Sequence, residues 1–513
     1  MRNDFSIFFG LIKRFITRYH QGGTQRLKKS RFFIFAVVLV LLFSMFFALV
    51  ACNEKGNNTD TGNNDGSQQE EIQYTASVTY TTSGIVILPG KDRPVYTATV
   101  RGVVVDEETG EPLISQLKIW DKTENLVYRT VTDYLGRYEL VLPDGSYDIE
   151  FSHGSEYEIE VLSDYIVYTN GYFKMPDISL KRLYNIGNWY AGDIHQHSTY
   201  SDGKDLPSEV LKSNIAVGLS YGILSDHNSV YQIKEWLAGN NFYIGGGKNF
   251  IAMQGWEVTT SRGHYQAINC DQIFNATAYS ASDILRIVND IRLQPNTIAQ
   301  INHPGRSDDM GFKDWNLAGR FDTIEVWNGV YAPPYLSGTN KNSYAKWVEL
   351  MNKGTRLAIV GGTDNHSIYG TPYAPDGSDL DWIKRNTYSG SPRTFVYTDD
   401  YSADGVFKAI KQGNSFITNG PMVFADIAGK KYGETATLAD NMVLNFDLKS
   451  NEELRQLKIF VNGKVVETID IADGTFTYTG TFALENLKSG DWVNLQLTGD
   501  FGGFAVTNPI FIE

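Results

Sequence analysis

The chain has 513 residues, and at that length we expect two to four domains rather than one. Hydrophobic residues make up 42% of the chain and aromatic residues 13%, which is ordinary for globular proteins, so most of it should fold. The formal net charge of −14 argues against a nucleic-acid-binding protein, because such proteins normally present a basic face.

The N-terminus is typical of an export signal. Residues 1–31 carry eight Lys and Arg against one acid, so the rest of the chain has a charge of −21. The apolar run FFIFAVVLVLLFSMFFALVAC follows at residues 32–52. Its ending Leu49-Val50-Ala51-Cys52 resembles the lipobox of bacterial lipoproteins, which implies lipidation of Cys52. The alternative is an uncleaved transmembrane anchor. Both interpretations tether the protein to the membrane, with its body outside the cytoplasm.

Residues 53–72 contain almost nothing to bury, so we expect a flexible linker. Residues 73–185 then show short alternating runs such as TATVRGVVVD and SYDIEFS, separated by turn residues. This period-two pattern predicts a β-sandwich. The order RGVVVDEETGEPL to TDYLGRYELVLPDGSYDIEFS, within residues 97–160, resembles carboxypeptidase regulatory-like β-domains, which implies a spacing or docking role.

In residues 188–420, strand-like and helix-like runs alternate. The predicted strands are WYAGDIH, YGILSD, FIAMQGWEV, TIAQINH, TIEVWN and RLAIVGG, and the predicted helices are LPSEVLKSNIAVG, SVYQIKEWLAGN, SASDILRIVNDIR, SYAKWVELMNKG and DGVFKAIKQG. Asp205 or Ser208 is expected to cap the first helix, and Ser280 or Ser282 the third. Alternation of this kind predicts a parallel β/α architecture, and a barrel of the TIM type fits the length.

Residues 421–513 return to short strands, which predicts a second β-sandwich. The pair Asn462-Gly463 between two such runs is a strong hairpin signal. The expected whole is a multidomain α/β protein, with a TIM-like barrel flanked by two β-sandwiches.

The stretch GDIHQHSTYSDG, residues 192–203, begins a series of metal-binding residue types. His195 and His197 are spaced i, i+2 and therefore face one side of a strand. Asp202 follows in a polar turn, and later predicted strands end in further candidates. These are His227, Glu257, His264, His303, Asp364 and His366.

Six of the eight histidines in the chain belong to this series. In a β/α barrel the strand C-termini converge on one rim, so the series should form a single cluster. Imidazole with carboxylate suits Zn, Mn or Fe(II), and nine candidate ligands exceed the needs of one ion, so two or three divalent ions are expected. Any one of these histidines, taken alone, is more often a hydrogen-bonded structural residue.

The motifs DIHQHSTYSDG, SDHN, GWEVTT with GH, NHP and GGTDNHS resemble those of the PHP (polymerase and histidinol phosphatase) superfamily. TIEVWNG, SPRTFVY and AIKQGNSFITNGP are similar to its exported carbaryl-hydrolase-type (CehA/McbA) branch. The resemblance spans about residues 190–420 and implies a distorted seven-stranded, (β/α)7 barrel with a trinuclear site.

The resemblance also implies a ligand set for three ions. The first ion would be held by His195, His197, Glu257 and Asp364. Glu257 would bridge to a second ion, completed by His264 and His303. Asp202, His227 and His366 would hold the third, where many members of the family have a histidine in place of the aspartate.

Other polar residues near these motifs are expected to support the site. Asp193 and Asp226 lie beside candidate ligands, and we expect each to accept the second N–H of an imidazole. Arg262, Arg306 and Arg393 are candidates to hold phosphate oxygens, and Arg393 is favoured as the residue that contacts substrate.

These features predict a metal-dependent hydrolase in which Glu257 and Asp364 support a metal-activated water. Phosphomonoesters or phosphodiesters are the favoured small-molecule substrates. An amide, ester or carbamate hydrolase with the same site is the first alternative, and a non-catalytic surface binding protein is the second.

Overall fold

The computed structural model describes residues 85–87, 97–168, 172–174, 177–245, 248–331, 338–368 and 389–513. All the described residues belong to one compact unit, Thr79–Glu513. The predicted signal segment with Cys52 and the predicted linker lie outside the described residues. Within the described part, no helix is both long and apolar enough to cross a bilayer.

The N-terminal region consists of two β-sheets, as its alternating pattern leads one to expect. One sheet has the order β1-β5-β2-β8, with β9 also paired to β2, and the other has the order β4-β3-β6-β7. The strands are β1 (Ile85–Ile87), β2 (Thr97–Asp106), β3 (Gln116–Asp121), β4 (Leu126–Val131), β5 (Arg137–Pro143), β6 (Gly145–Ser152), β7 (Glu160–Val167), β8 (Tyr172–Lys174) and β9 (Ile178–Leu180). Alternate residues of β5 and β6, among them Leu140, Leu142, Ile149 and Phe151, enter one shared core.

The middle region is mixed α/β. Its strands are β10 (Trp189–Asp193), β11 (Tyr221–Ile223), β12 (Tyr243–Gly245), β13 (Lys248–Asn249), β14 (Ile251–Met253), β15 (Gly255–Thr260), β16 (Gly263–Ile268), β17 (Ile298–Asn302), β18 (Thr323–Asn328), β19 (Ala358–Gly362), β20 (Arg393–Tyr397) and β21 (Ser415–Thr418). Its helices are α3 (Pro207–Ala216), α4 (Ile233–Leu237), α5 (Ala281–Ile291), α6 (Gly338–Asn352) and α8 (Ala403–Gln412), with 3-10 turns η1 (Ala238–Asn241), η2 (Trp315–Arg320) and η3 (Gly329–Tyr331). Each of the five predicted helices is present.

The regular alternation expected of a TIM-type barrel is interrupted. β10, β11 and β14 are parallel neighbours, and so are β17, β18 and β19. β16, which the sequence did not lead us to expect, runs antiparallel to both β15 and β17. No helix separates β15 from β16, and only η2 lies between β17 and β18. The observed fold is therefore mixed α/β with few helices, and a regular (β/α)7 barrel is not established.

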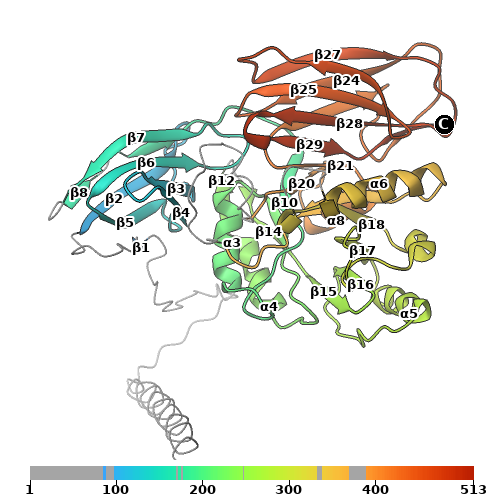
Figure 1. The fold of residues 1–513 in the computed structure, drawn as a ribbon, viewed down its shortest axis with the longest axis horizontal. Coiled ribbons are helices and arrows are strands. Elements are labelled where there is room, and N and C mark those ends of the chain that lie inside the picture. The colour runs from blue at the N-terminus through green and yellow to red at the C-terminus, as the bar shows by residue number, and fades with distance from the viewer. Residues whose placement is uncertain are drawn as a thin grey trace, which may run out of the picture. The chain divides into compact units, whose positions relative to one another are not determined.

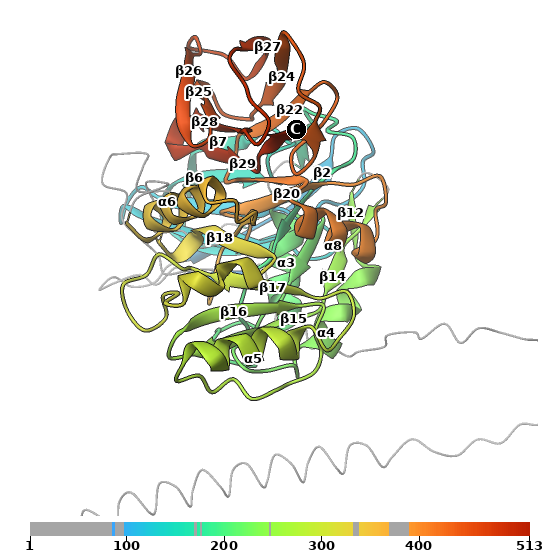
Figure 2. The same ribbon diagram turned by 90° about the vertical axis from the view of Figure 1, so that its right-hand side faces the viewer.

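Three connections join the two large sheets of the middle region. The chain passes from β14 into β15 with only Gln254 between them. Isolated bridges also pair Gln196 with Asn365 and His227 with Glu257. Helix α5 covers the outer side of β16 and β17, where its Ile284 and Ile287 share a core with Ile301 (Figures 1 and 2). The polar candidates are thereby left at the strand ends.

The helix caps agree with the sequence at α5 and differ at α3. Ser280 is the N-cap of α5 and forms a capping box with Asp283. Leu206 occupies the N-cap position of α3, with Pro207 following it, so the prediction of Asp205 or Ser208 was wrong. The Asp205 carboxylate instead accepts a hydrogen bond from the Ile368 amide, which ties it to the segment after His366.

The C-terminal strands continue a sheet of the middle region. They are β22 (Met422–Ile427), β23 (Thr435–Ala436), β24 (Met442–Lys449), β25 (Leu454–Val461), β26 (Lys464–Asp470), β27 (Thr477–Leu484), β28 (Trp492–Gly499), β29 (Phe504–Thr507) and β30 (Ile510–Ile512), with the turn η4 (Asp500–Gly502). β29 pairs with β21, so one eleven-stranded sheet crosses the predicted boundary at residue 420 (Figure 1). The predicted hairpin at Asn462-Gly463 is confirmed, since both residues have positive φ and join β25 to β26.

Candidate metal centre

The segment after β10 lies alongside the segment after β19, and this pairing brings the HxH and DNH motifs together. The Asp364 amide donates to the His195 carbonyl at 2.7 Å, and the His197 amide donates to the Asn365 carbonyl at 2.9 Å. Asp364 has a φ of 54°, in the left-handed region that non-glycine residues seldom adopt. Such strain persists where surrounding contacts enforce it, here at a cluster of functional groups.

The Glu257 carboxylate lies at the centre of the cluster, completely buried, and its two oxygens face different imidazoles. Around Oε1 are His264 Nδ1 at 3.2 Å, His303 Nε2 at 3.3 Å and the Asn302 amide nitrogen at 2.9 Å. Around Oε2 are His227 Nδ1 at 2.9 Å, His195 Nε2 at 3.3 Å and His197 Nε2 at 3.4 Å. One carboxylate thus faces two sets of nitrogen ligands.

A second carboxylate, Asp364, completes the first set. Its Oδ1 lies 3.0 Å from His197 Nε2 and 3.4 Å from His195 Nε2. Ligand atoms of His195, His197, Glu257 and Asp364 all lie within 4.8 Å of one another. This is the group that the family resemblance implied for the first ion.

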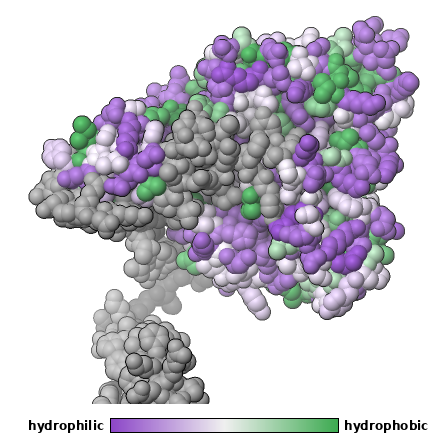
Figure 3. Space-filling view, viewed as in Figure 1, coloured by the Kyte–Doolittle hydropathy of each residue, from purple (hydrophilic) through white to green (hydrophobic). Residues whose placement is uncertain are grey.

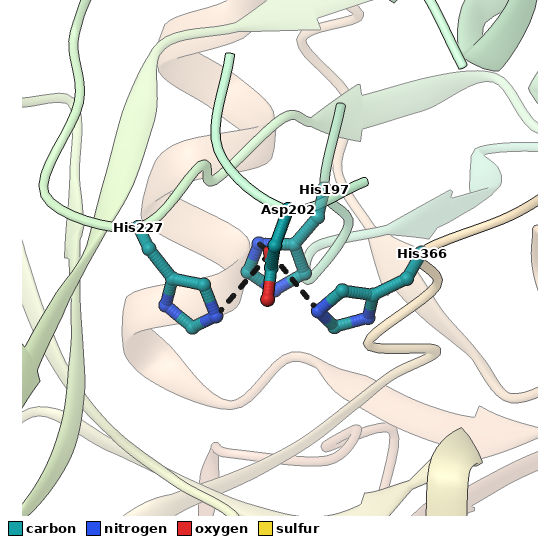
Figure 4. A group of neighbouring side chains, drawn as sticks. All are labelled: His197, Asp202, His227 and His366. Carbon is teal, nitrogen blue, oxygen red and sulfur yellow. Dashed lines mark ion pairs between the residues drawn. The ribbon is translucent and has the colours of Figure 1, made fainter. Parts of the chain in front are cut away.

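Asp202 forms a more open group with three imidazoles (Figure 4). Its Oδ1 lies 3.3 Å from His366 Nε2, 3.7 Å from His227 Nε2 and 4.0 Å from His197 Nδ1. The Asp202 side chain is 59% exposed, whereas Glu257 is buried. The structure therefore brings all nine predicted ligands together, and it adds His197 to this third group.

Three buried polar atoms of the cluster make no hydrogen bond of good geometry among the described residues, although each lies within 4 Å of an oppositely charged or polar neighbour in the cluster. They are His195 Nε2, His197 Nδ1 and Glu257 Oε2. Leaving such atoms unsatisfied costs about 1–3 kcal/mol each. Divalent cations would satisfy nitrogen and carboxylate lone pairs at once, and this donor set suits Zn, Mn or Fe(II). The residues present therefore fit the expected metal ions.

The electrostatics favour ionised carboxylates. Burial alone would raise the pKa of Glu257, but the imidazoles of His195, His264 and His227 hold it well below its ordinary value. The pKa of Asp364 is likewise well below its ordinary value, against the effect of burial. Burial lowers the pKa of both His197 and His264, which favours the neutral imidazole that ligates metals. Against the effect of burial, the carboxylates of Asp364, Glu325 and Glu257 raise the pKa of His195, and Glu257 raises that of His227. Metal binding at these two imidazoles would therefore displace protons.

Comparison with known proteins finds distant likenesses among solved structures alone. No protein-family model and no curated protein matches the chain. Among solved structures, a two-domain protein containing a predicted PHP-like metal-dependent phosphoesterase from Bacteroides vulgatus is 16% identical, with a TM-score of 0.36. That match covers 63% of this chain and 95% of the other.

Two further solved structures match this chain over most of their own length. PsfC from Pseudomonas syringae is 14% identical, with 44% of this chain and 88% of that one covered and a TM-score of 0.30. An amidohydrolase from Chromobacterium violaceum, with bound sulfate and no metal, is 18% identical, with 36% and 92% covered and a TM-score of 0.24. All three TM-scores lie below 0.5, so the functional argument rests on the site itself.

The structure gives Asp193 and Asp226 different partners from those predicted. The Asp193 carboxylate accepts hydrogen bonds from the Thr363 hydroxyl at 2.6 Å and from the Gly390 amide at 2.9 Å, and burial raises its pKa to about 6. The Asp226 carboxylate accepts from the hydroxyls of Ser198 and Ser201. Neither contacts an imidazole, so both shape the backbone near the ligands and the prediction of imidazole contacts was wrong.

A carboxylate that the sequence analysis gave no role does contact an imidazole. Glu325 Oε1 lies 3.0 Å from His195 Nδ1, and both side chains are completely buried. The signal was present in TIEVWN, where one acidic residue interrupts a strand whose six residues are all buried. Assigning that residue to His195 requires knowledge of the fold, because 130 residues separate the two in the chain.

The three candidate arginines are all engaged within the protein. Arg262 forms a double contact with the Asp314 carboxylate, and Arg306 pairs with Asp308. Arg393, the favoured residue, is 4% exposed and donates to the carbonyls of Gly390 and Val217 at 2.8 Å each. Its observed role is to hold backbone segments, which contradicts the prediction that it is available to a substrate.

Proposed function

We propose that this protein is a metal-dependent hydrolase. The observation that carries the proposal is the buried Glu257 carboxylate, with three nitrogen groups around each oxygen. A carboxylate can offer one oxygen to each of two ions, whereas a neutral imidazole has one free lone pair. Asp364 and the Nε2 atom of His195 supply further ligand atoms in the same space.

The predicted ligands form three groups, each placed to hold one ion. His195, His197, Glu257 and Asp364 would hold one ion, while His264 and His303 would hold another with Glu257. Asp202, His227 and His366 form the open group where a third would bind. Bound divalent ions supply a water of lowered pKa and stabilise charge on the attacked centre. Burial of Glu257 keeps bulk water from competing for its oxygens.

Phosphoesters are the favoured substrates, because sites with several ions neutralise the charge of a phosphoryl group. The paired arginines favour a second candidate, an amide, ester or carbamate hydrolase. With Arg262 and Arg306 bound to carboxylates and Arg393 buried, none of the three is placed to select an anionic substrate.

A substrate panel tests the proposal. Purified protein is analysed for bound metal, reconstituted with Zn, Mn or Fe(II), and assayed on phosphomonoester, phosphodiester, carboxyl ester, amide and carbamate substrates. We expect turnover of at least one phosphoester, lost on chelation and restored by metal. Turnover of only the uncharged substrates would select the second candidate. A metal-free protein, or one without turnover of any substrate, would contradict a hydrolase and favour a binding protein.

We also propose that the protein is exported and lipid-anchored through Cys52, a proposal that rests on the lipobox-like ending of its apolar segment. A Cys52→Ser variant should leave the membrane fraction or be mislocalised. Recovery of mature protein that still carries residues 1–51, shown by mass spectrometry, would contradict lipoprotein processing.

A further inference from the structure

The strand β18 buries a carboxylate and an amide that no step of the proposed function uses. Glu325 and Asn328 are both 0% exposed, in a strand whose remaining residues are mostly apolar. A buried carboxylate is expensive unless it is paired and hydrogen-bonded. The contacts of these two side chains therefore indicate why they are tolerated.

Glu325 receives three donors, two of them from candidate metal ligands. Oε1 lies 3.0 Å from His195 Nδ1, while Oε2 accepts from the His303 amide at 2.7 Å and from the Asn328 side chain at 3.1 Å. His303 has a positive φ of 28°, so its amide contact holds a strained turn. His195 and Glu325 can approach each other closely because residue 362 is glycine. A Cβ there would lie 2.5 Å from His195 Cβ and 3.2 Å from Glu325 Oε1.

Asn328 extends the contacts of Glu325 to a third candidate ligand. Its amide nitrogen lies 3.1 Å from Glu325 Oε2 and also 3.1 Å from Asp364 Oδ2. Asn340 of helix α6 exchanges two hydrogen bonds with the Asn328 backbone and so fixes its position. One amide thereby separates two carboxylates that would otherwise repel each other.

We propose that Glu325 and Asn328 are positioning residues for the metal centre. Glu325 accepts a hydrogen bond from the Nδ1–H group of His195, which leaves the Nε2 lone pair directed at Glu257 and Asp364. Asn328 holds Asp364 so that its Oδ1 faces the same space. This inference rests on the proposed metal-dependent function and deepens it, because it explains how ligands from three distant segments are held in one geometry.

Replacement of Glu325 by glutamine is the sharpest test. A glutamine has one acceptor oxygen and one donor NH₂. If the oxygen faces His303 and Asn328, the NH₂ faces His195 Nδ1 and forces the proton to Nε2. In the opposite orientation the NH₂ faces two other donors. Either way a contact is lost, with little change in volume.

The experiment uses full-length protein loaded with zinc and labelled with ¹⁵N-histidine. In the wild type we expect an exchange-protected Nδ1 proton on His195, assigned by comparison with His195→Gln. Glu325→Gln should release zinc to a chelator, with affinity reduced about 10- to 100-fold in either orientation of its amide, and it should lose the His195 signal in the orientation whose NH₂ faces Nδ1. Asn328→Asp, which places a third carboxylate between Glu325 and Asp364, should also weaken zinc binding.

Ile324→Ala is the matched control, because Ile324 is equally buried on β18 but packs in the apolar core. It should lose stability while keeping the His195 signal and wild-type zinc affinity. If Glu325→Gln keeps both the His195 signal and wild-type zinc affinity, the inference is overturned and the hydrolase proposal remains intact. Equal zinc loss in Ile324→Ala would also overturn the inference, since loss of fold stability would then be enough to explain the loss of zinc. A wild type that binds no zinc, manganese or iron would overturn both proposals.

Discussion

At the residue scale, Glu257 is the side chain on which the proposed chemistry depends. Its carboxylate is buried, its pKa is held low by imidazoles, and its oxygens face two sets of nitrogens. No other carboxylate among the described residues contacts five of the predicted histidine ligands. Changes at this position should therefore affect both metal retention and turnover.

Glu257→Gln keeps the shape of the side chain and removes its negative charge. We expect hydrolysis to fall by at least about 100-fold, because the ions lose their shared ligand and the water they activate regains a higher pKa. Steady-state rates and metal content measure the change, with Glu467→Gln as control, because Glu467 is a half-buried glutamate on β26 outside the cluster. Near-normal turnover on every substrate would make Asp364 the better candidate for the bridging residue.

His153, one of the two histidines outside the series, should make stability depend on pH. It is buried, its Nδ1 lies 2.6 Å from the Ile114 carbonyl, and burial lowers its pKa to about 4. The folded state therefore disfavours its protonation. The stability that the neutral ring contributes is present above about pH 6.5 and is lost as pH falls toward 4.

Comparison with His153→Gln isolates that contribution. Between pH 7 and pH 4.5 the wild type should lose about 2–3 kcal/mol more of its free energy of unfolding than the variant. Urea unfolding in the presence of chelator measures this, because the metal centre then contributes equally to both proteins. Parallel pH profiles would show that His153 does not carry the effect.

At the element scale, the turn between β15 and β16 decides where His264 lies. Gly263 has a φ of 119°, and a Cβ there would meet Tyr265 Oη at 3.1 Å and the Gly311 carbonyl at 3.3 Å. Because β16 runs back along β15, its first residues lie beside the end of β15, opposite Thr259 and Thr260. The turn thus returns an imidazole to the level of Glu257.

Gly263→Ala should cost about 1–3 kcal/mol through backbone strain and should reduce metal retention, since His264 is the next residue. Gly110→Ala is the control, because Gly110 also has a positive φ but has open space around it. Chemical unfolding and metal analysis of both variants separate the effects. If both variants keep wild-type metal content, the turn does not position His264.

At the scale of the whole molecule, the C-terminal strands are integral to one of the two sheets that carry the site. β21 pairs with β29, and Asn508 both donates to and accepts from the backbone of Ile359 in β19. Trp492 and Phe504 share a core with Ile417 and Trp327. All four side chains are buried, so this apolar area is covered in the intact chain. On the face seen in Figure 3, hydrophilic residues make up most of the coloured surface.

A protein truncated after residue 420 should therefore aggregate or lack a cooperative unfolding transition. The truncation removes β29, one of the two partner strands of β21, and exposes the core around Ile417. Solubility and thermal unfolding, compared with the intact chain, measure the outcome. A truncated protein with a cooperative transition and wild-type metal content would show that residues 421–513 are an independent domain.

Local patterns in the sequence determined which segments form strands and helices and which residues offer metal ligands. The i, i+2 spacing of His195 and His197, the Asn462-Gly463 turn and the periodicity of α5 are properties of neighbouring residues, so they can be read along the chain. The sequence also placed most of the candidates after predicted strands. In the structure Glu257 lies within β15 and His264 at the start of the antiparallel β16, so the cluster of all nine ligands depends on the tertiary structure as well.

Only the tertiary structure decided how distant segments pair. The antiparallel course of β16, the continuation of a sheet across residue 420, the contact of Glu325 with His195 and the engagement of Arg393 by backbone carbonyls all join residues far apart in the chain. The sequence alone does not show that the glutamate in TIEVWN contacts a metal ligand, whereas the arginine in SPRTF donates to backbone carbonyls. Hydrogen-bond partners are selected by the packing of the whole fold, and this physical constraint is not present in local sequence.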